Sequence, residues 1–87
     1  MSFRVLSVQA TPNPNAKKFV LDRFITKSPA SFFHPEAARS DPVASELFTI
    51  QGVASVLLLH DFVTINKKAD VKWNAITERV EQVLKGA

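Results

Sequence analysis

The residues of this sequence that could take part in recognition chemistry are concentrated in one polar segment, residues 11–15 (Thr-Pro-Asn-Pro-Asn), and in the lysines that follow it. Proline has no amide donor and asparagine side chains bond to nearby backbone, so a stiff turn is predicted here. Two interpretations remain open: a turn that is only structural, or a binding loop for a carboxylate, a phosphate or a peptide backbone. The candidate binding residues are Thr11, Asn13, Asn15, Lys17, Lys18 and Asp61.

The absence of cysteine limits the metal and redox chemistry of the chain. Without a thiol in 87 residues, there is no ligand for a zinc–thiolate site or a cysteine-bound cluster, and no thiol nucleophile. His34 and His60, with Glu36 and Asp61, form the one conceivable metal set, but their spacing matches no zinc motif, and surface histidines are predicted. No phosphate-binding loop or nucleophile elbow is present, so neither enzymatic activity nor a cofactor is predicted.

Basic residues outnumber acids and fall into two groups. The net charge is +3 and the pI is about 9.6. The first group is Arg4, Lys17, Lys18, Arg23 and Lys27, and the second is Lys67, Lys68 and Lys72. They could attract acidic proteins, phosphates or nucleic acid, or they simply solvate the surface. Nucleic acid is the weakest of these candidates, because few aromatic residues lie among the basic ones.

Length and hydropathy predict one small folded domain over residues 1–87. The chain is 46% hydrophobic and 22% charged, which is ordinary for a globular protein and too apolar for disorder. No apolar run approaches the roughly 20 residues that span a bilayer, and Met1 to Gln9 lacks the cleavage pattern of a signal peptide. A soluble, cytoplasmic protein without membrane contacts is expected, which agrees with the lack of disulfides.

The polar segment is predicted to join the two strands of a hairpin. In the first strand, Phe3 to Ala10, strict alternation places Leu6 and Val8 on one face and Val5 on the other. The second strand is predicted from Lys17 to Asp22.

A loop and then a helix are predicted in the middle of the chain. Residues 23–40 contain two prolines and are interpreted mainly as loop, in which residues 31–34 could form a short extended piece and residues 36–39 a helical turn. Within it, Phe32 and Phe33 either anchor the loop to the core or expose an apolar patch. The pair Asp41-Pro42 is a strong helix start, and Gly52 is placed to end that helix in a left-handed conformation.

The last third of the chain predicts a second hairpin and a second helix. Strands are predicted at Val53 to Leu58 and Phe62 to Lys67, with a turn at residues 59–61, and Asp70 is a candidate cap for the final helix. The apolar stripe of that helix is Trp73, Ile76, Val80, Val83 and Leu84. The predicted fold is α+β with the order β-β-α-β-β-α: two hairpins form a mainly antiparallel four-stranded sheet, and two helices pack on one face.

Three segments resemble the N-terminal domain of the Nfu/NifU scaffold protein family. Residues 11–19 are similar to its Thr-Pro-Asn-Pro-Asn-x-x-Lys-Phe signature, residues 47–56 to its helix-to-strand segment, and residues 61–67 to its Asp-Phe-Ile-Thr-Val-x-Lys strand. Order and spacing agree from about Gln9 to the last helix. The sequence departs from the family pattern at Leu59-His60, where the family often has glycine.

The resemblance carries expectations about function. Family members typically join this domain to a C-terminal one whose Cys-x-x-Cys pair binds and delivers iron–sulfur clusters, and that pair is not within these residues. A non-catalytic accessory or protein-interaction module is therefore implied, which binds no cluster itself and contacts a cluster-assembly scaffold or a client apoprotein. The alternative, from the residues alone, is a small anion- or phosphopeptide-binding domain that uses the asparagine and lysine loop.

Overall fold

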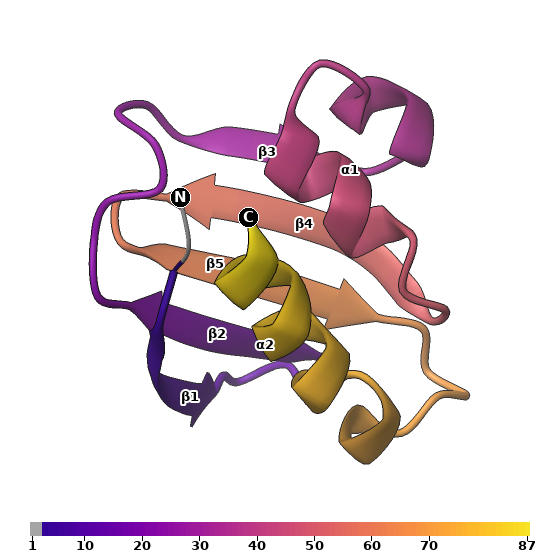
Figure 1. Ribbon diagram of the computed structural model, residues 1–87. Coiled ribbons are helices and arrows are strands. Elements are labelled where there is room, and N and C mark those ends of the chain that lie inside the picture. Colours follow the sequence, from indigo (N-terminus) through magenta and orange to yellow (C-terminus); the bar gives the residue numbers. More distant parts are fainter. Residues whose placement is uncertain (1–2) are drawn as a thin grey trace.

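The computed structural model describes residues 3–87, which form one antiparallel sheet with helices packed against it (Figure 1). In this part of the chain the strands are β1 (Val5–Ala10), β2 (Ala16–Leu21), β3 (Ala30–Phe32), β4 (Val53–Leu59) and β5 (Phe62–Lys67). The α-helices are α1 (Pro42–Phe48) and α2 (Thr77–Gly86), and the short 3-10 helices η1 (Pro35–Ala38) and η2 (Trp73–Ala75) precede them. The strand order is β1-β2-β5-β4-β3, with every neighbouring pair antiparallel. The predicted α+β class, with an antiparallel sheet and two helices, is confirmed.

Both predicted hairpins form, and their second strands lie side by side in the sheet. β1 pairs with β2 and β4 pairs with β5, while β2 and β5 join the two hairpins with Phe19 opposite Val63. In the same register Ala16 lies opposite Asn66. The segment of residues 11–15, which connects β1 to β2, is therefore held next to the end of β5.

The predicted number of four strands is wrong, because residues 30–32 add a fifth strand at the edge of the sheet. In β3, Ala30 lies opposite Leu58 and Phe32 lies opposite Val56. Three residues are too few to show an alternating pattern in the sequence. The strand forms because β4 supplies partners for its backbone groups, which only the tertiary structure reveals. The order of elements becomes β-β-β-α-β-β-α.

The two phenylalanines at the end of β3 have different environments. Phe32 packs against the core, whereas Phe33 is 67% exposed. Phe32 therefore anchors this segment to the core, whereas Phe33 is exposed to solvent.

An irregularity in β1 changes the face that its first residues occupy. The register shifts between Val5 and Ser7, which leaves Leu6 as the extra residue with a side chain 60% exposed. Because of this bulge, Val5 and Val8 both pack against the core instead of pointing to opposite faces. The strict alternation predicted for this strand is wrong at this point.

Helix α1 begins where the sequence predicts. The Asp41 carboxylate accepts hydrogen bonds from the backbone N–H groups of Val43 (3.1 Å) and Ala44 (3.0 Å), and proline occupies the first turn. The helix ends at Phe48, earlier than predicted, and a turn follows. Gly52 closes this turn with φ of +100°, a backbone conformation that favours glycine.

The predicted cap of the last helix at Asp70 is wrong. Helix α2 begins at Thr77, its N-cap residue is Ile76, and no side chain caps it. Between Asp70 and Thr77 the chain forms a turn and η2, in which Val71 packs against the core beside Gly52. These residues carry the chain from the end of β5 to the helix layer. The stripe is otherwise confirmed: Ile76, Val80 and Leu84 are buried, and Trp73 and Val83 pack against the core from partly exposed positions.

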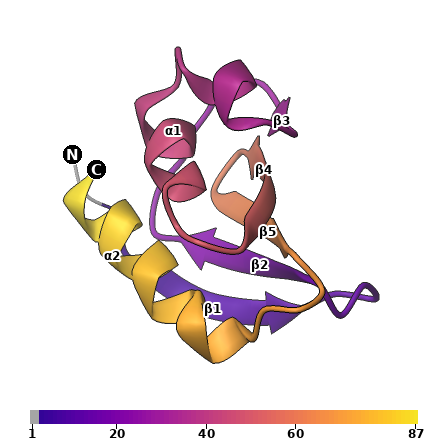
Figure 2. The same cartoon turned by 90° about the vertical axis from the view of Figure 1, so that its right-hand side faces the viewer.

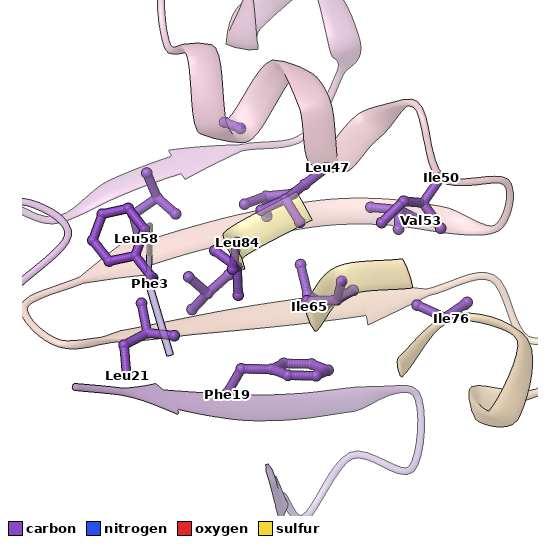
Figure 3. Close-up of a cluster of buried hydrophobic side chains, with 14 of the residues drawn as sticks. Phe3, Phe19, Leu21, Leu47, Ile50, Val53, Leu58, Ile65, Ile76 and Leu84 are labelled. Atoms are coloured by element: carbon purple, nitrogen blue, oxygen red, sulfur yellow. The ribbon is translucent and has the colours of Figure 1, made fainter. Parts of the chain in front are cut away.

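Helices α1 and α2 cover the same face of the sheet (Figure 2). The side chains between the two layers are apolar (Figure 3) and include Phe19, Leu47, Leu58, Ile65, Ile76 and Leu84. Phe3 joins this core, and its backbone N–H donates to the Leu84 carbonyl at 2.8 Å. Within residues 3–87 no polar or charged side chain is buried, so the core holds the fold together without providing a reactive group.

The other face of the sheet is not covered by either α-helix, and we call it the open sheet face. Its side chains come from the strand positions that alternate with the core residues. They belong to Ser7, Gln9, Ala16, Lys18, Val20, Ser31, Ser55, Leu57, Leu59, Phe62, Thr64 and Asn66.

Candidate functional site

The segment of residues 11–15 is held in one shape by its own hydrogen bonds. The Thr11 hydroxyl lies 2.9 Å from the Asn13 carbonyl and 3.0 Å from the Ala16 carbonyl, either of which accepts its proton. The hydroxyl oxygen accepts from the Asn13 N–H at 3.2 Å, and the Asn13 side-chain oxygen accepts from the Asn15 N–H at 2.9 Å. These are the side-chain-to-backbone bonds typical of Asn- and Thr-stabilised turns. The structural role predicted for Thr11 and Asn13 is thus visible in the geometry.

Two residues from distant parts of the chain support the same loop. The Lys67 ammonium donates to the Asn15 side-chain oxygen at 3.0 Å, across 52 positions of sequence, and the Lys67 N–H donates to the Asn15 carbonyl at 2.8 Å. The Trp73 indole N–H donates to the Pro14 carbonyl at 3.0 Å. We call the group of Thr11, Asn13, Asn15, Lys17, Lys67 and Trp73 the loop site.

The loop site is electrostatically positive. The ammonium groups of Lys17 and Lys67 lie 5.3 and 6.0 Å from the centroid of the Trp73 ring, within the range of cation–π attraction. In the described part of the chain, the one salt bridge joins Arg23 to Asp22. Neither lysine therefore has a carboxylate partner among residues 3–87, and their charge is available to an anionic group.

The polar groups that remain at the loop site are hydrogen-bond donors. Among the described residues no hydrogen bond engages the side-chain NH₂ of Asn13 or Asn15, whose oxygen atoms are already occupied. Together with the Lys17 ammonium, these groups could donate to a carboxylate, a phosphate or a carbonyl. The arrangement contains donors and positive charge, but no general base and no nucleophile.

The structure does not bring all six candidate residues together. Lys18 is adjacent to Lys17 in β2 and therefore points to the opposite side of the sheet, where its ammonium lies 4.1 Å from the centroid of the Phe62 ring. Asp61 lies at the other end of β5, about 17 Å from Asn66 at 3.3 Å per residue, and its carbonyl accepts from the Leu21 N–H at 2.7 Å. The loop site thus contains Thr11, Asn13, Asn15 and Lys17 of the original set.

Lys67 and Trp73 are members of the loop site that the sequence pattern does not indicate. The sequence places Lys67 in a basic group and Trp73 in an apolar helix stripe. The pairing of β2 with β5 brings them to the loop, and no local pattern predicts this pairing. The separation of Lys17 from Lys18, by contrast, follows from the two-residue period of a strand.

One carboxylate far from the loop site has a shifted ionisation. The backbone N–H of Arg4 donates to Asp22 at 3.0 Å, and together with the Arg23 guanidinium it holds the pKa of the Asp22 carboxyl below its usual value.

The histidines and acids considered as a metal set do not converge. His34 precedes η1, whereas His60 lies in the turn between β4 and β5, and no three His, Asp or Glu side chains of residues 3–87 form a group that could hold a metal ion. No helix in the described residues has the length and apolar character required to cross a membrane.

The sequence of this chain is similar to those of known proteins. Residues 6–87 match the family described as "Scaffold protein Nfu/NifU N terminal". The human protein named NFU1 iron-sulfur cluster scaffold homolog, mitochondrial, is 36% identical over 76 residues, which are 85% of this chain and 30% of that protein. NifU-like protein 5, mitochondrial, from Arabidopsis thaliana is 35% identical over 72 residues, which are 82% of this chain and 26% of that protein. The chain spans about 30% or less of the length of these curated relatives.

Solved structures share the fold. The crystal structure of protein SAV1430 from Staphylococcus aureus superposes with a TM-score of 0.80 at 24% identity, over 94% of this chain and 99% of that chain. The NifU-like protein from Saccharomyces cerevisiae gives a TM-score of 0.78 at 27% identity, over 90% of this chain and 72% of that chain. Residues 6–87 match the family, and the structure places the loop signature of residues 11–15 beside Trp73. The chain therefore belongs to the N-terminal family of Nfu/NifU scaffold proteins.

Proposed function

We propose that this chain is a non-catalytic accessory module of iron–sulfur cluster assembly, which binds a protein partner and holds no cluster of its own. The observation that carries the proposal is a match to the N-terminal scaffold family over residues 6–87 in a chain of 87 residues without cysteine. Clusters are bound mainly through cysteine thiolates, so these residues do not fit a cluster. The connection to cluster assembly rests on the names of relatives such as the human iron-sulfur cluster scaffold homolog.

The loop site is the surface that we assign to the partner. Because Lys67 and Trp73 hold the loop from outside, little conformational entropy is lost when a partner binds it. Its positive charge favours an acidic surface on a scaffold protein or client apoprotein, and charge of this kind raises the rate of association.

Co-purification tests this proposal. The tagged chain, a Lys17→Glu variant and a Lys27→Glu control are expressed in the same cells, and bound proteins are identified by mass spectrometry. Cluster-assembly proteins or apoproteins that receive clusters are expected with the unchanged chain and with the control, at several-fold lower yield with Lys17→Glu. Recovery of no such protein with the unchanged chain would contradict the function. Equal recovery with all three chains would contradict the loop site as the contact.

Reconstitution tests the second half of the proposal. The purified chain is incubated anaerobically with ferrous iron and sulfide and then desalted. We expect no visible-light chromophore at stoichiometric yield, because the chain offers no thiolate ligand. A stable stoichiometric cluster on this chain would overturn the proposal.

Binding of a small anion or a phosphopeptide is a second candidate for the same site. It is favoured by the position of two ammonium groups over one indole ring, at 5.3 and 6.0 Å. Addition of a phosphorylated peptide should then shift the amide NMR signals of Asn13, Asn15 and Lys17, and Lys17→Glu should abolish the shifts. Unchanged spectra at millimolar peptide would exclude this function.

A further inference from the structure

Apolar side chains form a continuous patch on the open sheet face. One row across the strands runs Val20, Phe62, Leu59, since Phe62 lies opposite Val20 in β2 and opposite Leu59 in β4. The neighbouring row contains Leu57 opposite Thr64. Side chains that are directly opposite in adjacent strands lie about 5 Å apart, so Val20, Phe62 and Leu59 are neighbours across the strands. Leu57 lies on the same face two positions before Leu59 in β4 and extends this surface.

The patch does not belong to the hydrophobic core. The core and the side chains packed against it include neither Val20, Leu57, Leu59 nor Phe62, and all four keep part of their surface exposed. Phe24, 69% exposed, lies against His60, the residue after Leu59, with ring centroids 5.8 Å apart and the ring planes tilted by 51°. Contiguous apolar surface on a small protein marks an interaction site more often than scattered exposed residues do.

A single charge lies at the edge of this apolar surface. Lys18 is the one charged residue among the strand positions of the open sheet face, and its ammonium lies 4.1 Å from the Phe62 ring centroid. No carboxylate within residues 3–87 forms a salt bridge with it. The patch is thus apolar with one unpaired positive charge at its edge, and its complement is an apolar surface with one negative charge.

We propose that the open sheet face binds an amphipathic helix of a protein partner, whose apolar side chains cover Val20, Leu57 and Phe62 and whose Asp or Glu pairs with Lys18. This inference deepens the proposed function, because it names a second contact surface of the interaction module and the chemistry of the segment that it binds. The partner helix completes a three-layer arrangement in which both faces of the sheet are covered.

A helix is favoured over an extended peptide by the hydrogen bonding of the sheet. β2, β5 and β4 are interior strands, paired on both sides, so their backbone groups are not available to a ligand that lies across the face. An extended peptide laid on this face would bury its own N–H and C=O groups without partners. A helix satisfies these groups internally and contacts the face with side chains alone.

A second copy of this chain is a poor complement for the same face. The open sheet face contributes Lys18 and no acid from its strand positions, so two copies placed face to face leave both ammonium groups without a counter-charge. Each copy also carries a net charge of +3, which opposes association.

The test uses the full chain and two designed helical peptides as probes. Each peptide has leucines at positions i, i+3, i+4 and i+7. One further position on the leucine face is glutamate in the first peptide and lysine in the second. We expect the glutamate peptide to shift the amide NMR signals of Val20, Leu57 and Phe62. The lysine peptide should bind about fivefold to tenfold more weakly, as expected for loss of one ion pair and addition of one repulsion.

Two charge reversals provide the matched comparison. Lys18→Glu should weaken the glutamate peptide about fivefold to tenfold and make the lysine peptide the better ligand. Lys85→Glu changes the net charge equally, lies on exposed surface of α2 on the covered side, and should leave both affinities unchanged. Undisturbed signals of the buried residues Leu47 and Ile76, which are not neighbours of either changed position in the sequence, confirm that each variant keeps its fold.

Several results would overturn the proposal. The first two are NMR shifts confined to Asn13, Asn15 and Lys17, and no shifts with either peptide at millimolar concentration. The third is an equal effect of the two charge reversals on peptide affinity. The fourth is self-association through Val20 and Phe62 that depends on protein concentration. None of these outcomes depends on a cluster-assembly partner. Failure of the peptide test and failure of the co-purification test are therefore distinguishable.

Discussion

Two neighbouring residues of β2, Lys17 and Lys18, belong to different surfaces of the molecule. Lys17 lies on the side of the sheet that the helices cover, near Trp73, and Lys18 lies over Phe62 on the uncovered side. The covered side buries Phe19 and its neighbours and provides the stability of the fold. The uncovered side keeps apolar residues partly exposed and outside the hydrophobic core. A strand with a two-residue period therefore supplies one protein with both a core and a surface for binding.

The largest difference between the two sides should appear when a core side chain is truncated. Phe19→Ala removes a fully buried ring between the sheet and the helices, and should lower the free energy of unfolding by about 3–5 kcal/mol. Urea denaturation followed by Trp73 fluorescence measures the effect. A loss below about 1 kcal/mol would mean that the covered side is not the source of stability.

A smaller but still severe effect is expected at the joint between α1 and β4. A Cβ added at Gly52 would lie 2.8 Å from Cγ1 of Val71, in a backbone with φ of +100°. Gly52→Ala should therefore cost about 2–4 kcal/mol in unfolding free energy, from backbone strain and overpacking together. A double-mutant cycle with Val71→Ala separates the two causes, since the second change relieves the steric contact only. Additive effects would exclude the contact as a cause.

Trp73, on the covered side, is expected to make a modest contribution to the stability of the loop site. Trp73→Phe keeps most of the apolar ring but removes the N–H that donates to the Pro14 carbonyl, at a cost of about 1 kcal/mol. Amide hydrogen exchange should accelerate at Asn15 and in the rest of the loop while Val63 and Ile65 stay protected. Unchanged exchange at Asn15 would show that the indole does not hold the loop.

On the uncovered side a polar replacement should cost little stability. Leu57→Ser removes an apolar side chain that is not packed against the core, and the unfolding free energy should fall by about 1 kcal/mol or less. Binding of the glutamate peptide should weaken in the same variant. If Leu57→Ser destabilised the chain as much as Phe19→Ala, the distinction between the two sides would be lost.

The smallest effect concerns Asp22, the residue that follows β2. The Arg4 N–H and Arg23 hold its pKa below the ordinary value of 3.8. Because the folded pKa is the lower one, Asp22 stabilises the fold above pH 3.8, and this contribution is lost as the pH falls through the folded pKa. A carboxyl ¹³C titration should give a midpoint below 3.8 for Asp22. Arg23→Ala should raise it only in part, since the larger cause, the Arg4 N–H, remains.

Local signals in the sequence predict the fold well wherever the structure depends on neighbouring residues. Asp41 caps α1, Gly52 has the predicted left-handed backbone, and the strand of residues 62–67 has its predicted limits. The failures lie where distant segments decide. The strand at residues 30–32 depends on β4, and the bulge at Leu6 depends on pairing with β2. The chain near Asp70 must cross to the helix layer, which no cap signal reveals.

The candidate site was predictable to a similar degree. The loop of residues 11–15 was evident from its prolines and asparagines, and family membership was evident from its motifs. The contacts of Asn15 with Lys67 and of Pro14 with Trp73 join residues more than 50 positions apart, and no spacing rule predicts them. Assigning Lys17 and Lys18 to one surface overlooked the alternation of a strand, although the sequence already contained that information.

The hydrogen bond between the Phe3 N–H and the Leu84 carbonyl has a practical consequence for experiments on this protein. Because it joins the beginning of the described chain to the last turn of α2, a short glycine–serine linker could connect the ends, and a new opening at the turn near His60 would give a circular permutant with the same sheet. A chain immobilised by either end would keep the helix layer toward the sensor surface. The uncovered strands would then face the solution, where a binding helix could reach them.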